Sequence, residues 1–276
     1  MTPELSKLKA VRHLALDMDG TIYKGGTLFD FTRACLTRLD TLGIGYTFLT
    51  NNSSKSVRDY LLHLRKLGIN ANPEQMYTSM MCAADYLRRQ LPQARRLYIL
   101  GTPSLRQEFV EAGFADVGED EEPEAVVIGF DTGLAYSRLC KAAWWIKQGK
   151  PFIATHPDRI CPTDLPTVLV DCGAVCACLE SATGRKPDKV LGKPDPWMLQ
   201  GILNRHQLLP NELAMVGDRL YTDMAMASHA GAVGVLVLTG EATAAEAAKC
   251  SPQPDVIAPS LLELTQWLEE CHFEIL

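Results

Sequence analysis

Two acidic residues follow the first apolar segment of the chain, where a predicted strand ends. Residues 11–16 form a short, largely apolar run, and Asp17 and Asp19 come directly after it, ahead of Gly20. Side chains alternate along an extended chain, so the two carboxylates point the same way, and glycine permits the turn that brings both over one site. Crowded carboxylates repel each other unless a cation lies between them or one is protonated. The pair therefore indicates a cation site or acid–base chemistry, although a solvated turn would also explain such a pair on its own.

Two further polar clusters stand at positions suited to binding an anion. Thr50, Asn51 and Asn52 come directly after the β-rich residues 46–49 and before a helical pattern. A hydroxyl and backbone N–H groups at a helix start form a natural phosphate cradle, although they can equally be a plain N-cap. Lys193 stands between glycine and proline just ahead of another predicted helix. Its ammonium could neutralise an anion or simply face solvent.

A fourth cluster follows a later predicted strand. Asp218 comes directly after Gly217, and Asp223 stands five positions further on. Each cluster alone has an ordinary structural explanation, but four of them in the order Asp-x-Asp, Thr, Lys and Gly-Asp…Asp would rarely arise together by chance. The carboxyl ends of strands are where open α/β sheets bind ligands. We therefore expect a functional site at this edge of a sheet.

Apolar periodicity predicts an α/β fold with an insertion. Strands and helices alternate from the start, which favours a parallel sheet, and a second, smaller α/β unit begins at residue 79. We expect a core formed by residues 1–78 and 185–276 and an inserted domain over 79–184, in which the acidic segment 119–122 is a solvated turn. Strands are predicted at residues 11–16, 46–49, 97–100, 125–130, 152–154, 213–216 and 233–238, and helices at 29–42, 57–67, 80–91, 103–113, 136–148, 196–206, 222–230 and 261–270.

The composition limits which partners and which cellular location are expected for the chain. Its 276 residues, 47% of them hydrophobic and 22% charged, are enough to bury a core. The net charge of -6 argues against nucleic acid or an anionic membrane as a partner, because these need a concentrated basic face. The first residues contain no long hydrophobic segment of the kind a secretory signal or membrane span requires, so a cytoplasmic location is expected. Nine cysteines, an odd number, fit reduced thiols.

The four clusters together resemble the motifs of the haloacid dehalogenase-like (HAD) superfamily. The resemblance is greatest to the NagD-like subfamily (class IIA, with a large α/β cap), and it implies a Rossmann-like core and a cap domain, over residues 79–184, that closes over the active site and selects the substrate. The matching segments are Asp17-Met18-Asp19-Gly20-Thr21, Thr50-Asn51-Asn52-Ser53, Gly192-Lys193-Pro194 and Gly217-Asp218 with Thr222-Asp223.

The resemblance also implies how phosphoryl transfer would proceed. Asp17 would attack the phosphoryl group to form an aspartyl-phosphate, and Asp19 would be the general acid for the leaving oxygen and then the base for water. Thr50 and Lys193 would bind phosphoryl oxygens. A dehalogenase needs no such acid because a halide leaves without a proton. Asp19 therefore favours a phosphate ester as substrate.

A magnesium ion is the implied cofactor. It would be held by the Asp17 carboxylate, the Asp19 backbone carbonyl and the Asp218 carboxylate, with Asp223 in a supporting position. The expected activity is that of a phosphatase for a small phosphorylated metabolite, such as a sugar phosphate, a nucleoside monophosphate, phosphoglycolate, glycerol phosphate or pyridoxal phosphate. Two alternatives are a receiver-like phosphoacceptor signalling module, which would need half this length, and a catalytically silent phosphate-ester binding protein.

The predicted insert carries residues whose roles stay open. His156 stands where relatives often have asparagine, and it is either a substrate contact or a solvent-exposed turn residue. Asp158 and Arg159 would meet a polar substrate or pair with each other.

Other residues of the insert suggest packing and assembly. Cys172, Cys176 and Cys178 are expected to be buried structural thiols, since their spacing lacks the paired arrangement of a zinc site. Trp144 and Trp145 fit the core of the insert or an interface that would make a homodimer.

Overall fold

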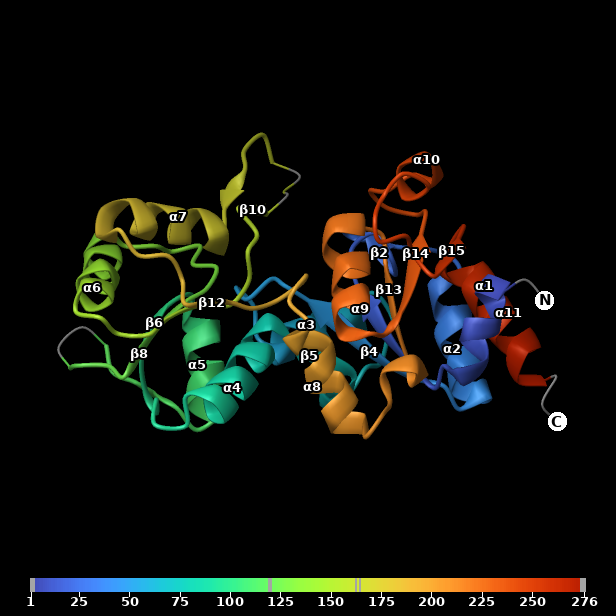
Figure 1. The fold of residues 1–276 in the computed structure, drawn as a ribbon, viewed down its shortest axis with the longest axis horizontal. Coiled ribbons are helices and arrows are strands. Elements are labelled where there is room, and N and C mark those ends of the chain that lie inside the picture. The colour runs from blue at the N-terminus through green and yellow to red at the C-terminus, as the bar shows by residue number, and fades with distance from the viewer. Residues whose placement is uncertain (1–2, 119–120, 162, 164, 274–276) are drawn as a thin grey trace. The chain divides into compact units, whose positions relative to one another are not determined.

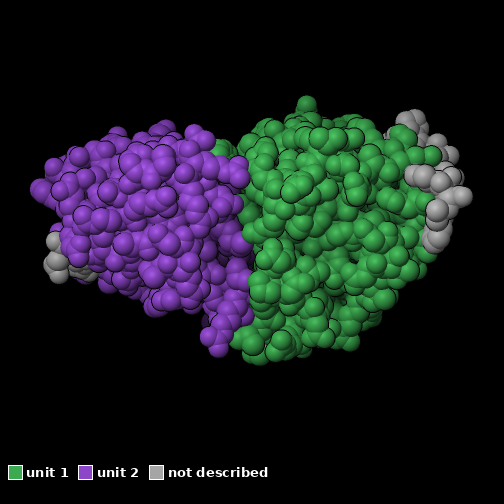
Figure 2. All heavy atoms as spheres, turned by 90° about the horizontal axis from the view of Figure 1, so that it is seen from below, with its two compact units in different colours: residues 1–49, 61–77, 194–276 green, residues 50–60, 78–193 purple. Residues whose placement is uncertain are grey.

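The computed structural model describes residues 3–118, 121–161, 163 and 165–273. Contacts between residues divide the chain into two compact units, which Figure 2 colours separately. Unit 1 comprises residues 1–49, 61–77 and 194–276, and unit 2 comprises residues 50–60 and 78–193. The insert expected over 79–184 lies within unit 2, and its boundaries as a functional domain stay a prediction. Of the acidic segment 119–122, residues 119 and 120 lie outside the described residues.

Unit 1 is built on one sheet of six strands. They are β1 (His13–Asp17), β4 (Gly45–Thr50), β5 (Met76–Thr78), β13 (Leu213–Gly217), β14 (Val233–Val237) and β15 (Val256–Ala258), beside a two-stranded hairpin of β2 (Tyr23–Lys24) and β3 (Thr27–Leu28). The helices are α1 (Pro3–Ser6), α2 (Thr32–Leu42), α3 (Val57–Lys66, shared with unit 2), α8 (Trp197–His206), α9 (Ala225–Ala230), α10 (Ala244–Ala247) and α11 (Leu261–Phe273).

The order of this sheet is β15-β14-β13-β1-β4-β5. The first five of these strands run parallel, and β1 lies in the middle with His13 opposite Leu213 on one side and Gly45 on the other. Helices α2 and α11 pack together on one face, and α8 and α9 pack together on the other (Figure 1). Because helices cover both faces, β1 reads as a continuous apolar run rather than an alternating one.

Unit 2 is a smaller α/β layer structure with its own parallel sheet. Its order is β12-β9-β8-β6-β7, with α6 and α7 packed together and α4 and α5 packed together (Figure 1). The strands are β6 (Arg96–Leu100), β7 (Ala115–Asp116), β8 (Ala125–Ile128), β9 (Phe152–Ala154) and β12 (Lys189–Val190), with a separate pair β10 (Ile160–Cys161) and β11 (Leu169–Val170). The helices are α4 (Ser79–Gln90), α5 (Pro103–Glu111), α6 (Tyr136–Lys147) and α7 (Cys172–Thr183).

The structure adds elements that the periodicity did not predict. The edge strands β5, β12 and β15 are two or three residues long, too short to show a period of their own. The helix expected over 222–230 is also different, because it begins with a π-helical turn at Leu220–Met224 before α9. Among the described residues, no helix is both long and apolar enough to cross a bilayer.

Candidate active site

Three of the acidic residues meet at the carboxyl ends of the strands in unit 1. β1 ends at Asp17 and its parallel neighbour β13 ends at Gly217 in matching register, so Asp218 leaves the sheet at the same edge. The turn Leu220–Met224 carries Asp223. One carboxylate oxygen of each of the three residues lies within 4.8 Å of the other two. Carboxylate oxygens so close together suit a hard divalent cation such as Mg²⁺, which would offset their repulsion.

Glycines make room for these carboxylates. A Cβ on Gly20, whose φ is +86°, would lie 2.4 Å from Asp218 Oδ2, and a Cβ on Gly240 would lie 1.9 Å from the same atom. A Cβ on Gly217 would lie 2.3 Å from Asp223 Oδ2. Any other residue at these positions would displace a carboxylate. The backbone is thus shaped around the two buried acidic side chains, and glycine at these positions leaves them the space they occupy.

Backbone donors fix the same two side chains. The Glu241 N–H donates to Asp218 Oδ2 at 2.7 Å, and the Arg219 N–H donates to Asp223 Oδ2 at 3.2 Å. Asp218 and Asp223 are also buried, so little water screens their charges. Their orientation is therefore set by the fold before any ligand binds.

Asp19 lies apart from this set, on the turn into the β2–β3 hairpin. Its side chain is exposed, and its Oδ1 accepts a hydrogen bond from the Gly25 N–H at 2.9 Å. The turn is closed by the Gly20 N–H, which donates to the Tyr23 carbonyl at 2.7 Å. The Asp19 side chain is therefore not one of the three clustered carboxylates.

Arg219 joins the site although the sequence did not single it out. Burial alone would lower the pKa of its guanidinium, but Tyr221 and the carboxylates of Asp17 and Asp218 raise it above the usual arginine value. Its Nε also pairs with Glu241 Oε2 at 3.0 Å. The signal available in the sequence was its position directly after Asp218, which an ordinary surface arginine could share.

The residues predicted to bind phosphate lie in unit 2. Thr50 is the last residue of β4, and its Oγ1 accepts a hydrogen bond from the Asn52 N–H at 3.2 Å. Asn52 Oδ1 in turn accepts from the Ser54 N–H at 2.9 Å. These bonds fix the turn between β4 and α3. Lys193 is 5% exposed, and its backbone is held by the Asn51 side chain.

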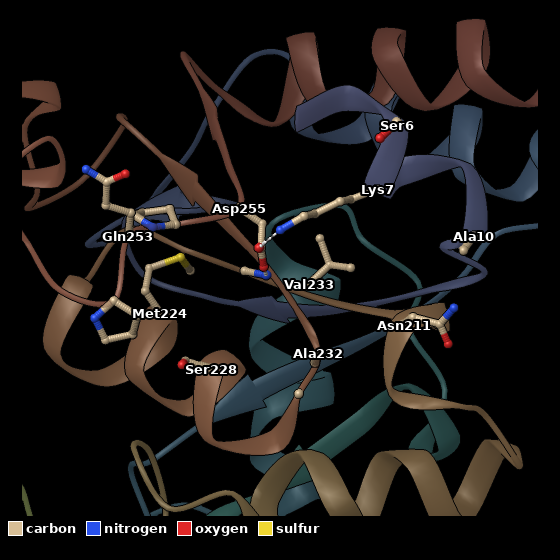
Figure 3. Close-up of a pocket in the computed structure, with 14 residues that line it drawn as sticks. Ser6, Lys7, Ala10, Asn211, Met224, Ser228, Ala232, Val233, Gln253 and Asp255 are labelled. Atoms are coloured by element: carbon tan, nitrogen blue, oxygen red, sulfur yellow. Dashed lines mark hydrogen bonds and ion pairs between the residues drawn. The ribbon is translucent and has the colours of Figure 1, made fainter. Parts of the chain in front are cut away.

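A pocket of about 600 Å³ lies elsewhere in unit 1. Figure 3 shows Lys7 and Asp255 forming an ion pair within it, and Val233 and Asn211 also line the pocket. Val233 begins β14 and Asn211 precedes β13, so the pocket lies at the amino-terminal ends of the strands. The residues that line it include none of those predicted to do chemistry. Open α/β sheets bind ligands at the other edge, and we assign this pocket no catalytic role.

Comparison with known proteins identifies the family to which this chain belongs. Residues 14–115 match the family described as haloacid dehalogenase-like hydrolase, and residues 190–264 match the family described as HAD-hydrolase-like. The ribonucleotide monophosphatase NagD of Escherichia coli K12 is 32% identical over 92% of this chain and 98% of its own length. The chain belongs to the NagD-like subfamily of the HAD superfamily.

Solved structures agree with this assignment. A 4-nitrophenylphosphatase from Thermotoga maritima superposes with a TM-score of 0.88 at 37% identity, covering 94% of this chain and 98% of that one. A glycerol phosphate phosphatase from Mycobacterium tuberculosis, solved in complex with magnesium, gives a TM-score of 0.86 at 32% identity, covering 94% and 78%. The predicted α/β fold, with a parallel-sheet core and an inserted α/β domain, is confirmed. This HAD protein is a phosphoric monoester hydrolase.

The effect of filling the space beside Asp218 can be predicted for this HAD core. Gly20→Ala is expected to lower the free energy of unfolding by on the order of 3 kcal/mol, since the new Cβ both strains the backbone and meets Asp218 Oδ2. Gly25→Ala is the matched control, because Gly25 has a φ of +58° with nothing within 4 Å of its Cβ position, and about 1 kcal/mol is expected there. Denaturant unfolding measures both. Equal losses would show that the contact with Asp218 is unimportant.

His156 corrects the expectation of a solvent-exposed turn residue. Its side chain is fully buried, with Nε2 2.8 Å from Asp171 Oδ1 and Nδ1 2.9 Å from Thr155 Oγ1. The exposed-turn alternative is wrong because Asp171, at the N-terminus of α7, supplies a buried partner 15 residues away. Asp158 accepts a hydrogen bond from Asn51 at 3.1 Å.

The buried His156–Asp171 pair predicts a pH-dependent stability. Burial lowers the pKa of His156, but Cys172 and Asp171 outweigh it and raise the pKa from 6.5 to about 9. The folded state therefore holds a proton that the unfolded state releases above pH 6.5. The stabilisation contributed by protonated His156 is complete below that pH and is lost as the pH rises to about 9.

Denaturant titrations of the wild type and of His156→Gln at several pH values check this. The difference in free energy of unfolding between the two should shrink between pH 6.5 and 9. A constant difference across this range would mean that His156 is neutral in the folded protein.

The cysteines and tryptophans of unit 2 divide between core and surface. Cys172 and Cys176 are buried as expected, but Cys178 is exposed, since six residues along α7 bring it to a different side of the helix. Trp145 packs against the core of unit 2, whereas Trp144 is 54% exposed on α6. A homodimer through this face of α6 stays a prediction.

Proposed function

We propose that this HAD protein is a magnesium-dependent phosphatase that hydrolyses small phosphorylated metabolites through an aspartyl-phosphate on Asp17. The observation that carries the proposal is the cluster of Asp17, Asp218 and Asp223, whose carboxylate oxygens lie within 4.8 Å of one another behind glycines that admit no side chain. The relative from Mycobacterium tuberculosis, solved with magnesium, supports the cofactor.

The donor set fits magnesium. Asp17 and Asp218 would offer carboxylate oxygens and Asp19 its backbone carbonyl, with Asp223 supporting the site, and all of these are the hard oxygen ligands that Mg²⁺ prefers. When bound, the ion would neutralise charge on the phosphoryl oxygens and on the nucleophile. Without a cation, three clustered carboxylates would repel an anionic substrate.

The chain's own residues would carry the two chemical steps. An oxygen of Asp17 attacks phosphorus while the bond to the leaving oxygen breaks, and Asp19 donates a proton to that oxygen. Asp19, now deprotonated, takes a proton from water, which attacks phosphorus and releases inorganic phosphate with recovery of Asp17. Thr50, Asn52 and Lys193 would bind phosphoryl oxygens, together with the backbone of Asn51.

The relatives support a class of small phosphate esters as substrates. Their names point to nucleoside monophosphates, glycerol phosphate and synthetic nitrophenyl phosphate. We propose a substrate of this size, a range that includes sugar phosphates, phosphoglycolate and pyridoxal phosphate. We also propose that the enzyme acts in the cytoplasm, where its nine cysteines would stay reduced.

Release of inorganic phosphate from a panel of these esters, with magnesium or with excess EDTA, tests the proposal. Hydrolysis of at least one ester, dependent on magnesium, is expected. Stable labelling by acetyl phosphate without turnover would favour the receiver-like alternative instead. Binding of esters with no phosphate release would favour the silent binding protein.

A further inference from the structure

The side chain of Asn51 forms hydrogen bonds with both the backbone N–H and the backbone carbonyl of Lys193. Asn51 Oδ1 accepts a hydrogen bond from the Lys193 N–H at 2.7 Å, and Asn51 Nδ2 donates to the Lys193 carbonyl at 3.1 Å. The two residues are 142 positions apart in sequence, and they are 8% and 5% exposed. Water is therefore poorly placed to replace these bonds, and losing them would leave buried polar groups unsatisfied.

Asp158 fixes the orientation of the same amide. Asn51 Nδ2 also donates to Asp158 Oδ2 at 3.1 Å. An amide nitrogen has two hydrogens, and here both meet acceptors while the amide oxygen meets an N–H. A flipped amide would face the Lys193 carbonyl and the Asp158 carboxylate with oxygen. Only one orientation of Asn51 satisfies all three partners.

A buried pair stands beside Asp158. His156 Nε2 lies 2.8 Å from Asp171 Oδ1, which also accepts from the Cys172 N–H at 2.6 Å. One ligand-type atom each of His156, Asp158 and Asp171 lies within 4.8 Å of the others. Each of these side chains already has a hydrogen-bond partner within unit 2. Asp158, which accepts from the Asn51 amide, is therefore part of a group of polar side chains held by hydrogen bonds.

Gly192 allows the backbone ahead of Lys193 to approach Asn51 and His156 closely. Its φ is +71°, and a Cβ there would lie 2.7 Å from both Asn51 Oδ1 and His156 Cβ. The residue before Lys193 therefore packs closely against both Asn51 and His156. Only glycine fits, and the path of the backbone into Lys193 is set by these two neighbours.

We propose that Asn51 is a positioning residue that holds the backbone of Lys193, and that Asp158 keeps the Asn51 amide in the orientation this requires. The inference rests on the proposed function, in which the Lys193 ammonium binds a phosphoryl oxygen. The Asn51 side chain is committed to Lys193 and Asp158, which leaves only its backbone for the phosphate contact expected from the sequence.

A double-mutant cycle tests whether Asn51 acts through Lys193. With p-nitrophenyl phosphate and magnesium, Asn51→Asp is expected to lower kcat/KM about tenfold or more, because the variant loses both Nδ2 donors, and to weaken inhibition by inorganic phosphate to a similar extent. In a Lys193→Ala background the same change should cost less than about twofold. An equal loss in both backgrounds would overturn the proposal. Absence of hydrolysis by the wild type would count instead against the proposed function.

An exchange of donor and acceptor gives a second test. Asp158→Asn alone should also lower kcat/KM. This variant tests the proposal if Asn51→Asp does not fold. Combining the two changes restores a donor–acceptor pair and should recover part of the loss. No recovery in a folded double variant would contradict the role of Asp158. Asn204→Asp, the same change at an exposed position on α8, should leave the kinetics unaltered.

Discussion

Replacing Asp17 with asparagine is expected to lower kcat by at least about 10⁴-fold, the scale seen when a covalent nucleophile is removed. An amide oxygen has no negative charge with which to attack phosphorus, and no other residue of unit 1 is proposed for that role. The change keeps the size of the side chain at the end of β1. Phosphate release at saturating substrate and magnesium measures it.

The same variant should fold about as well as the wild type. Removing the Asp17 charge relieves repulsion from Asp218 and Asp223 and also removes an attraction to Arg219, so the metal-free variant is expected to unfold at a similar temperature. Asp40→Asn, on the exposed side of α2, is the control and should retain full activity. Substantial activity of Asp17→Asn would remove Asp17 as the nucleophile, and loss of folding would make the kinetic result uninformative until a milder variant is tested.

Magnesium is expected to stabilise the wild type and not Asp218→Asn. A ligand that binds only the folded state adds about 2.7 kcal/mol at a concentration of 100 times its Kd. Asp218 supplies a buried carboxylate held by the Glu241 N–H at 2.7 Å, and its neutral analogue is a far weaker magnesium ligand. Thermal unfolding with and without magnesium measures the shift.

Calcium gives a useful comparison, since it accepts similar oxygen ligands with a less strict geometry. Asp40→Asn should show the full magnesium shift of the wild type. A full shift in Asp218→Asn as well would place the ion elsewhere, and EDTA-resistant hydrolysis by the wild type would argue against a required metal.

Much of the fold could be predicted because its central elements carry strong local patterns. β1 and β13 are largely apolar runs, and α2 ends at Leu42, just before Gly43, whose φ of 67° is the left-handed conformation that favours glycine. The edge strands β5 and β15 could not be predicted this way, because three residues carry no period and their pairing depends on neighbours far along the chain.

The candidate site was predictable in its residue types and only partly in its arrangement. Asp17 is the last residue of β1 and Asp218 directly follows β13, and the sheet brings them together because the two strands are parallel neighbours. The burial of His156 depends on Asp171, and the space around Asp218 depends on Gly240, which lies in the loop after β14. Neither relation leaves a local trace in the sequence, because each joins segments that meet only in the folded chain.

The central claim is that Asp17 becomes covalently phosphorylated during turnover. Rapid quenching of the wild type with a hydrolysed ester and magnesium, followed by borohydride reduction and peptide mass spectrometry, tests it directly, since an aspartyl-phosphate is reduced to homoserine. We predict homoserine at position 17 in the wild type and none in Asp17→Asn. Reduction at another residue, or its absence under conditions in which phosphate is released and a known acyl-phosphate protein is labelled, would contradict the account.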